Sequence, residues 1–282
     1  DGTAGRPPGR PEPAYAGSSS RRGFFPWRGL NSSRYSSSSY ESASPSFVGA
    51  TFFRVEIRWP SDARYSWSAS CWRVRMALAH KSLEVETLPW RFTEKETIAF
   101  SGQDKVPVLV DGEKSVHDSW TIAEYLDETY PQKPLFDSQQ ARGQGMLVKQ
   151  WVETQVNPII GRIILVDLFD NIHEMDKSYF KESREKRFGM TLEALCADRP
   201  AQIEALNRAL VPLRNTLKIQ PYIAGEAPNY ADYIVFGSLQ WARTSAPVEV
   251  LPDADDPVRA WRDRLLDMYD GLARDAWLPQ AA

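Results

Sequence analysis

Residues 105–127, KVPVLVDGEKSVHDSWTIAEYLD, decide the fold of this chain. The apolar run 106–110 is typical of a short buried strand, and Asp111-Gly112 after it favours a tight hairpin turn. Residues 114–117 then return as the partner strand. The apolar residues that follow recur at helical spacing until Pro131 stops them. This stretch therefore predicts a β-β-α unit.

The residues on its N-terminal side predict a β-α-β unit. Residues 53–59 and 83–88 alternate apolar and polar side chains, as half-buried strands do. Between them, Cys71, Val74 and Leu78 fall on one face of an amphipathic helix. A loosely structured connection leads from the second strand to the hairpin. We therefore expect an α/β domain over residues 51–132.

The second half of the chain, residues 137–280, is predicted to be an all-α helical bundle. Residues 146–169 predict one long helix that Pro158 kinks. Further helices are predicted at 178–197 and 201–217, and after two capping signals, Asn229-Tyr-Ala-Asp232 and Asp256-Pro257.

Residues 1–50 differ from the rest and predict a low-complexity leader. They hold twelve Ser, six Arg, no Lys and three acidic residues. Such a stretch buries too little apolar surface to fold alone. Its Arg-rich, Ser-rich and acid-poor composition is also that of an organelle transit segment. We therefore expect a mitochondrial or plastid location, with a cytoplasmic one as the alternative.

The composition of the chain excludes several classes of function. The net charge of -3 gives no reason to expect a nucleic-acid partner. No apolar run reaches the roughly 20 residues that a membrane-spanning helix needs. The two cysteines, Cys71 and Cys196, make no disulfide framework and fit a reducing compartment. Three scattered histidines offer no metal-site spacing, so we expect no metal.

The order of these features resembles the glutathione transferases. The resemblance rests on the βαβ unit, Val106-Pro107 opening a strand, the hairpin, and Asp118-Ser119 opening a helix. Residues 225–232, GEAPNYAD, look like the buried capping box of that family's sixth helix. The likeness covers roughly residues 52–275. It implies a thioredoxin-like N-terminal domain, an all-α C-terminal helical bundle, and glutathione as co-substrate.

Within that superfamily, the chain most resembles the lignin β-etherase type of bacteria and the related fungal transferases. The stretches that carry this likeness are residues 71–81, 118–127, 179–185 and the helix start at 256–257.

The resemblance implies four glutathione-binding residues. In this fold Pro107 is cis, which exposes the backbone of Val106 to pair with the cysteinyl part of glutathione, as a strand would. Alternatively, Pro107 only shapes the turn. At Asp118-Ser119, backbone N–H groups, the helix dipole and the Ser119 hydroxyl converge on an anion. The γ-glutamyl carboxylate would fit there, and Asp118 could hold its ammonium. Alternatively, Asp118 or Ser119 only caps the helix.

Ser68 is the candidate catalytic residue. Glutathione reacts as thiolate, whereas a thiol's ordinary pKa is about 8.5. A hydroxyl at the N-terminus of the first helix would donate to the thiolate and lower that pKa. Cys71, on the apolar stripe, is interpreted as a buried small hydrophobe. The family usually has Pro after this Ser, where this chain has Ala69, and Ser66 and Ser70 are rival hydroxyls.

Two functions remain open from the sequence. In the first, the thiolate of glutathione attacks an electrophilic, aromatic or ether, small molecule in an apolar pocket between the domains, lined partly by the helix 146–169. In the second, the chain is a non-catalytic accessory subunit of a larger protein complex that residues 1–50 contact, because a fold does not fix a function. Protein partners are expected in either case, as a homodimer or as neighbouring subunits.

Overall fold

The computed structural model describes residues 55–60 and 68–280, with the backbone alone for 55–60. These residues belong to one compact unit, Thr51–Ala282. The predicted leader, residues 1–50, and the rival hydroxyl of Ser66 lie outside the described residues. None of the described helices is long and apolar enough to cross a membrane.

The first half forms the predicted βαβ-ββα arrangement. Its four strands lie in the order β2-β1-β3-β4, with β1 parallel to β2 and the other pairs antiparallel. Ile57 of β1 pairs with Thr87 of β2 and Leu109 of β3. The elements are β1 (Val55–Pro60), α1 (Ala69–His80), β2 (Val85–Trp90), the 3₁₀ helix η1 (Lys95–Ser101), β3 (Val108–Asp111), β4 (Lys114–His117) and α2 (Ser119–Thr129).

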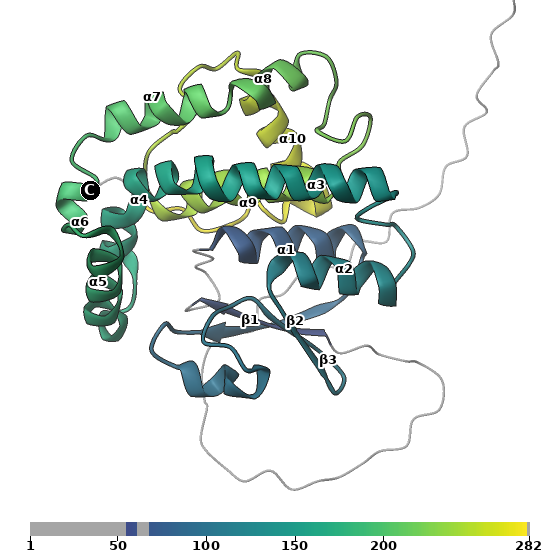
Figure 1. Ribbon diagram of the computed structural model, residues 1–282, viewed down its shortest axis with the longest axis horizontal. Helices are drawn as coiled ribbons and strands as arrows, with labels where there is room; N and C mark the ends of the chain where they lie inside the picture. The colour runs from purple at the N-terminus through teal and green to yellow at the C-terminus, as the bar shows by residue number, and fades with distance from the viewer. Residues whose placement is uncertain (1–54, 61–67, 281–282) are drawn as a thin grey trace, which may run out of the picture. The chain divides into compact units, whose positions relative to one another are not determined.

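The second half is helical, as predicted. Its elements are α3 (Gln139–Trp151), the π-helical turn η2 (Val152–Val156), α4 (Asn157–Asn171), α5 (Glu174–Phe188), α6 (Leu192–Leu195), α7 (Arg199–Ala209), α8 (Val211–Leu217), α9 (Tyr230–Ser245) and α10 (Pro257–Gly271). Figure 1 shows α1 and α2 between the sheet and this helical layer, in which α3 and α9 run above α1.

The long helix predicted at 146–169 begins earlier and breaks differently. Helix α3 already starts at Gln139, where Ser138 caps it by accepting from the Ala141 N–H. The break is the π turn η2 rather than a simple kink. Pro158 has no N–H to offer the Thr154 carbonyl, so the hydrogen-bond ladder shifts there, and the Asn157 N–H bonds to the Val152 carbonyl instead.

Two other predicted helices are each two helices. The prediction of one helix over 178–197 is wrong because Gly189, at φ 71°, ends α5 in the left-handed conformation. The prediction of one helix over 201–217 is wrong because the chain restarts at Leu210. Pro212 then stands in the first turn of α8, where a missing N–H is tolerated.

The capping signals of the last two helices are confirmed. Asn229 caps α9, and Asp232 completes a reciprocal capping box. The buried Asp232 carboxylate also accepts from the Trp261 indole N–H and the Ile223 N–H, each at 2.8 Å, which ties α9 to α10 and to the preceding loop. Asp256 caps α10 by accepting from the Val258 N–H, and it takes a two-pronged ion pair from Arg214.

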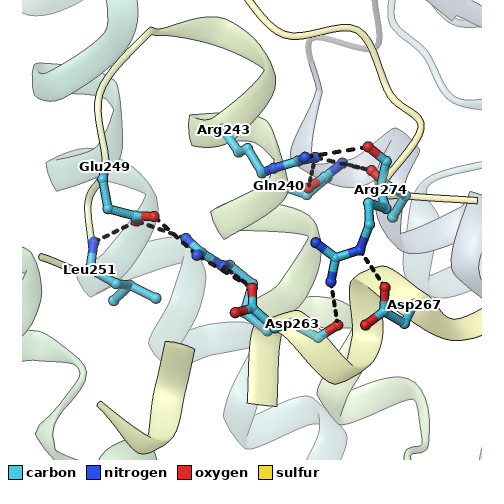
Figure 2. A network of polar contacts seen from close by, with 9 residues as sticks. Gln240, Arg243, Glu249, Leu251, Asp263, Asp267 and Arg274 are labelled. Atoms are coloured by element: carbon cyan, nitrogen blue, oxygen red, sulfur yellow. Dashed lines mark hydrogen bonds and ion pairs between the residues drawn. The ribbon is translucent and has the colours of Figure 1, made fainter. Parts of the chain in front are cut away.

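A polar network secures the C-terminal segment (Figure 2). Arg243 of α9 donates to the carbonyls of Ala273 and Arg274, which follow α10. The buried Arg262 holds both carboxylate oxygens of Glu249. A cavity of about 230 Å³ lies beside them, lined by these three side chains and by apolar residues. Arg243 therefore holds the segment that follows α10, and the Arg262–Glu249 pair holds the loop between α9 and α10.

Helix α1 and helix α9 meet at Gly237. A Cβ atom added at Gly237 would lie 2.6 Å from the Ala69 carbonyl oxygen and 3.0 Å from Arg73 Cγ. No side chain larger than hydrogen fits without moving backbone. The contact therefore fixes how closely the first turn of α1 approaches the helical layer.

Substitution Gly237→Ala should destabilise the protein by about 1–3 kcal/mol through overpacking of a backbone contact. The matched control is Gly143→Ala in α3, where an added Cβ meets nothing within 4 Å. That change should leave stability unchanged or raise it by about 0.5–1 kcal/mol, since Ala favours the helix. Denaturant unfolding of both variants measures the difference. Equal stability of the two variants would contradict the close α1–α9 contact.

A histidine-tyrosine cluster joins α1, α9 and the end of α10. The Tyr233 hydroxyl lies 2.7 Å from His80 Nδ1 and 2.5 Å from the Tyr269 hydroxyl. Burial, and then the neighbouring Lys81 charge, lower the pKa of His80 below its ordinary 6.5, although Asp127 acts against this. Neutral His80 is therefore the form that the fold favours.

Because the folded pKa is lowered, the unfolded chain binds the proton more readily. The stability contribution of His80 is present above about pH 6.5 and declines as the pH falls below that value. Thermal unfolding of His80→Gln should thus show a smaller loss of stability between about pH 7 and about pH 5 than the parent protein. Identical pH profiles would rule out this role for His80.

Candidate functional site

Ser68 stands at the N-cap of α1, as the sequence predicts for a residue at the helix N-terminus. Its backbone is extended, with φ −144° and ψ 124°, and its Oγ accepts from the Cys71 N–H at 3.3 Å. A hydroxyl that accepts through a lone pair still has its own proton to donate. Capping therefore orients Ser68 without using up the proton that a thiolate would require. Its catalytic role stays a prediction.

Cys71 is confirmed as a buried hydrophobe. Its side chain is inaccessible, and burial raises the pKa of its thiol to about 12, although the Ser68 hydrogen bond acts in the opposite direction. A thiol held protonated in this way is a poor nucleophile. Cys71 and Cys196 are both free and buried, so neither provides an exposed thiol for disulfide exchange.

The Val106–Pro107 peptide bond is cis, as the resemblance implies. Pro107 is buried and leads into β3, whose pairing begins at Val108. Val106 is only partly buried, and its backbone N–H and C=O make no hydrogen bond to another described residue. These two groups can therefore still pair with an extended ligand, as an edge strand does.

Asp118 combines helix capping with backbone strain. Its Oδ1 accepts from the Trp120 and Thr121 N–H groups at 3.0 and 3.1 Å, so the alternative role, capping, is present. Its φ of 68° with ψ 128° is an unfavourable conformation for a residue other than glycine. Strain of this kind is retained where the surroundings enforce it, often at ligand sites. Asp118 is an exposed residue, and its Oδ2 takes part in neither capping bond.

Ser119 is the first residue of α2 and is almost fully buried. The hydroxyl of Tyr230, at the start of α9, donates to its carbonyl oxygen. The next two N–H groups of α2 donate to Asp118. The N–H and hydroxyl of Ser119 make no hydrogen bond within the described part of the chain, so they are available as donors at this helix end. Together with the helix dipole, they form a suitable anchor for a carboxylate.

The sequence-based reasoning missed two residues that organise the site. One is Tyr230, which fixes the Ser119 carbonyl from the helical domain. The other is Arg73, which lies buried on α1 and donates to Glu153 of η2 at 2.9 Å. The sequence did offer a signal for Arg73: it is a charged residue next to Val74 and close to Cys71, both on the apolar stripe of the predicted helix, which indicates a charge that could be buried with that stripe.

An aromatic cluster lies where α5 meets the loop after β2. Phe180 packs on Phe92 with ring centroids 5.6 Å apart, and the Arg184 guanidinium lies 4.1 Å above the Phe180 ring. The loop is held there because Asp176 accepts from both the N–H and the hydroxyl of Thr93. Phe92 and Val106 both pack against the buried cluster of Trp90, Ile98 and Val108, which links this apolar wall to the candidate glutathione turn.

The described residues contain no group of three or more His, Cys, Asp or Glu side chains that could hold a metal ion. The candidate site consists of backbone groups, two hydroxyls, one carboxylate and two helix N-termini, a set suited to a small peptide-like anion.

Comparison with known proteins matches both halves of the chain to one family. The model of the glutathione S-transferase N-terminal domain matches residues 64–134, and that of the C-terminal domain matches residues 145–266. The chain is 40% identical over 75 residues to glutathione S-transferase Z1 of Arabidopsis thaliana, and 37% identical over 86 residues to a maleylacetoacetate isomerase of Pseudomonas aeruginosa. These matches cover 24% and 28% of this chain, and only 34% and 41% of the relatives' own lengths.

Solved structures of fungal transferases share the fold. Glutathione transferase GSTFuA3 from Phanerochaete chrysosporium superposes with a TM-score of 0.70 at 20% identity, covering 76% of this chain and 97% of that one. The Ceriporiopsis subvermispora transferase CsGST63524, in complex with glutathione, gives 0.66 at 18% identity, covering 81% and 100%. With the family's two domains matched in order and the thioredoxin-like and helical halves packed as described, this chain belongs to the glutathione S-transferase superfamily.

Proposed function

We propose that this protein is a glutathione transferase. Glutathione binds beside the turn that leads into β3 and the N-terminus of α2, and its thiol is activated at the N-terminus of α1. The observation that carries the proposal is the N-terminus of α2. There a strained, exposed Asp118 and the donors of the buried Ser119, which no described residue uses, offer complementary charge for the γ-glutamyl group. The backbone groups of Val106, which bond to no described residue, offer strand-like pairing for the cysteinyl part.

In this arrangement the protein contributes a lowered thiol pKa and positioning. The sulfur would lie near the Ser68 hydroxyl, where the proton of Ser68 and the α1 dipole both stabilise the thiolate. The thiolate then attacks an electrophilic carbon, the new C–S bond forms, and the leaving group departs with the bonding electron pair. Ser68 is not consumed in this step.

We further propose an aromatic or ether substrate, as for the β-etherase type. The partly buried Phe92 and Phe169, which both pack on the core residue Phe180, support this substrate class, because aromatic side chains favour a flat apolar ligand. Arg184, above the Phe92 and Phe180 rings, adds a cation that would attract a departing aryloxide.

A second candidate is glutathione-dependent isomerisation. It is favoured by the partial likeness, 37% identity over 71 and 86 residues, to two proteins named as maleylacetoacetate isomerases. Here the thiolate adds to a conjugated double bond and leaves again after rotation, so glutathione is regenerated.

A glutathione-affinity column followed by turnover assays separates these proposals. Retention with conjugation of a generic aryl halide or an aryl ether supports the transferase. Retention with isomerisation of a cis-dienone, without consumption of glutathione, supports the second candidate. Retention without turnover would indicate a binding-only site, and absence of retention would favour the accessory-subunit alternative.

Substitution Ser68→Ala should reduce thiolate-dependent turnover by about 100-fold, as for loss of one preorganised donor, while the glutathione Kd stays within about twofold. Because Ser68 also caps α1, the matched control is Ser138→Ala, which removes the equivalent cap of α3. The control should lose similar stability and keep full turnover. Equal turnover of Ser68→Ala and the parent protein would remove Ser68 from the mechanism.

Substitution Asp118→Asn should weaken glutathione binding by about tenfold through loss of a charge-assisted contact. Asn keeps a capping oxygen and tolerates positive φ, so stability should stay unchanged. A glutathione analogue that lacks the γ-glutamyl amino group should bind the parent and the variant equally. Calorimetry measures the affinity of both proteins for both ligands. If the variant loses as much affinity for the analogue as for glutathione, Asp118 does not bind the ammonium group.

A further inference from the structure

A buried arginine on α1 carries a charge that its surroundings compensate only in part. The Arg73 side chain is 1% exposed, and its Nη1 donates to Glu153 Oε1 at 2.9 Å. Among the described residues, its Nε and Nη2 have no hydrogen-bond partner. Buried donors without partners cost free energy, so a guanidinium kept in this state calls for an explanation.

The counter-charge of Arg73 comes from the π turn between α3 and α4. Glu153 lies in η2, and its second oxygen, Oε2, accepts from Lys149 Nζ at 2.8 Å. Partial burial acts to raise the pKa of Glu153, but the hydrogen bonds from Lys149 and Arg73 hold it below its ordinary value. Glu153 is therefore ionised, and two cations around one carboxylate leave the cluster with an excess of one positive charge.

This positive charge lies behind the candidate glutathione site. Arg73 follows Ser68 by five positions along α1, which is about 7.5 Å along the helix axis, and helical side chains lean towards the N-terminus. Arg73 also acts electrostatically on the Tyr230 hydroxyl, the group that holds the Ser119 carbonyl. Arg73 therefore lies less than two turns from the α1 N-terminus and within electrostatic range of the tyrosine that holds the α2 N-terminus.

We propose that Arg73 is a positioning residue that sets the electrostatic potential at the glutathione sulfur, and that Glu153 limits this potential. The inference rests on the proposed glutathione site. The charge is buried, so salt screens it weakly. At an effective dielectric constant of about 20, one unit charge about 8–10 Å away shifts a thiol pKa by about one pH unit.

The two partners of this ion pair should then affect bound glutathione in opposite directions. Arg73→Met keeps an unbranched stem against α9 and leaves Glu153 paired with Lys149, so the pKa of the bound thiol should rise by about one pH unit. Glu153→Gln removes the negative charge, and the thiol pKa should fall by a similar amount. The ultraviolet absorbance of the thiolate, titrated in the glutathione complex, measures both values.

Folding effects are separated by two further variants. Glu153→Gln leaves a buried charge unpaired and is the variant most at risk of unfolding. The double variant Arg73→Met/Glu153→Gln removes one charge of each sign and should return the thiol pKa close to that of the parent protein. Arg208→Met breaks an exposed ion pair with Glu204 on α7, and it controls for a change in net charge.

The outcomes are distinct. Opposite shifts in the single variants, cancellation in the double variant and no shift in Arg208→Met support the proposal. If the pair were merely structural, both single variants would loosen α1 and shift the thiol pKa in the same direction. Such shifts of the same sign, or no shift while glutathione still binds, would overturn the proposal for Arg73 and leave the proposed function intact. If the parent protein fails to bind glutathione in calorimetry, both proposals are overturned together.

Discussion

The packing of α1 against α9 is the constraint on which the rest of this structure depends. At Gly237 the two helices come so close that the space beside the Ala69 carbonyl admits only hydrogen. Helix α1 carries Ser68 at its start, and α9 carries Tyr230 at its start. Because Tyr230 holds the Ser119 carbonyl, the same contact also fixes α2 relative to α1. Both ends of the candidate site are therefore positioned by one helix from the other half of the chain.

The packing of α1 also explains why the candidate site is polar although the helix that carries Ser68 is largely buried. Trp72, Val74 and Met76 of α1 are inaccessible, so the helix is held by apolar packing along its length. Its N-terminus and that of α2 project donors that intrahelical bonds cannot satisfy. Ser68 and Asp118 satisfy some of them, and the remainder at Ser119 suits an anionic ligand. Arg73 and Glu153 add a charged pair behind these groups.

Much of the fold could be predicted from local pattern. The hairpin at Asp111-Gly112, the capping box of Asn229 and Asp232, and the start of α10 at Asp256 all rest on short-range rules, and the structure confirms each. The helix breaks were harder to predict. Gly189 and Pro212 were visible in the sequence, but periodicity alone did not show which of these residues would end a helix.

Local sequence signals were enough to predict the order of the four strands, most of the helices, the caps of α9 and α10, and the candidate set Ser68, Val106, Pro107, Asp118 and Ser119. These follow from turn chemistry, hydrophobic period and family resemblance, which are properties of neighbouring residues. The contacts of Tyr230 with Ser119 and of Glu153 with Arg73 are visible only in the tertiary structure. The partners are separated by 111 and 80 positions along the chain, respectively, so no local sequence signal marks their contact. The strained φ of Asp118 likewise depends on the packing that enforces it, because no intrinsic preference of an aspartate favours that conformation.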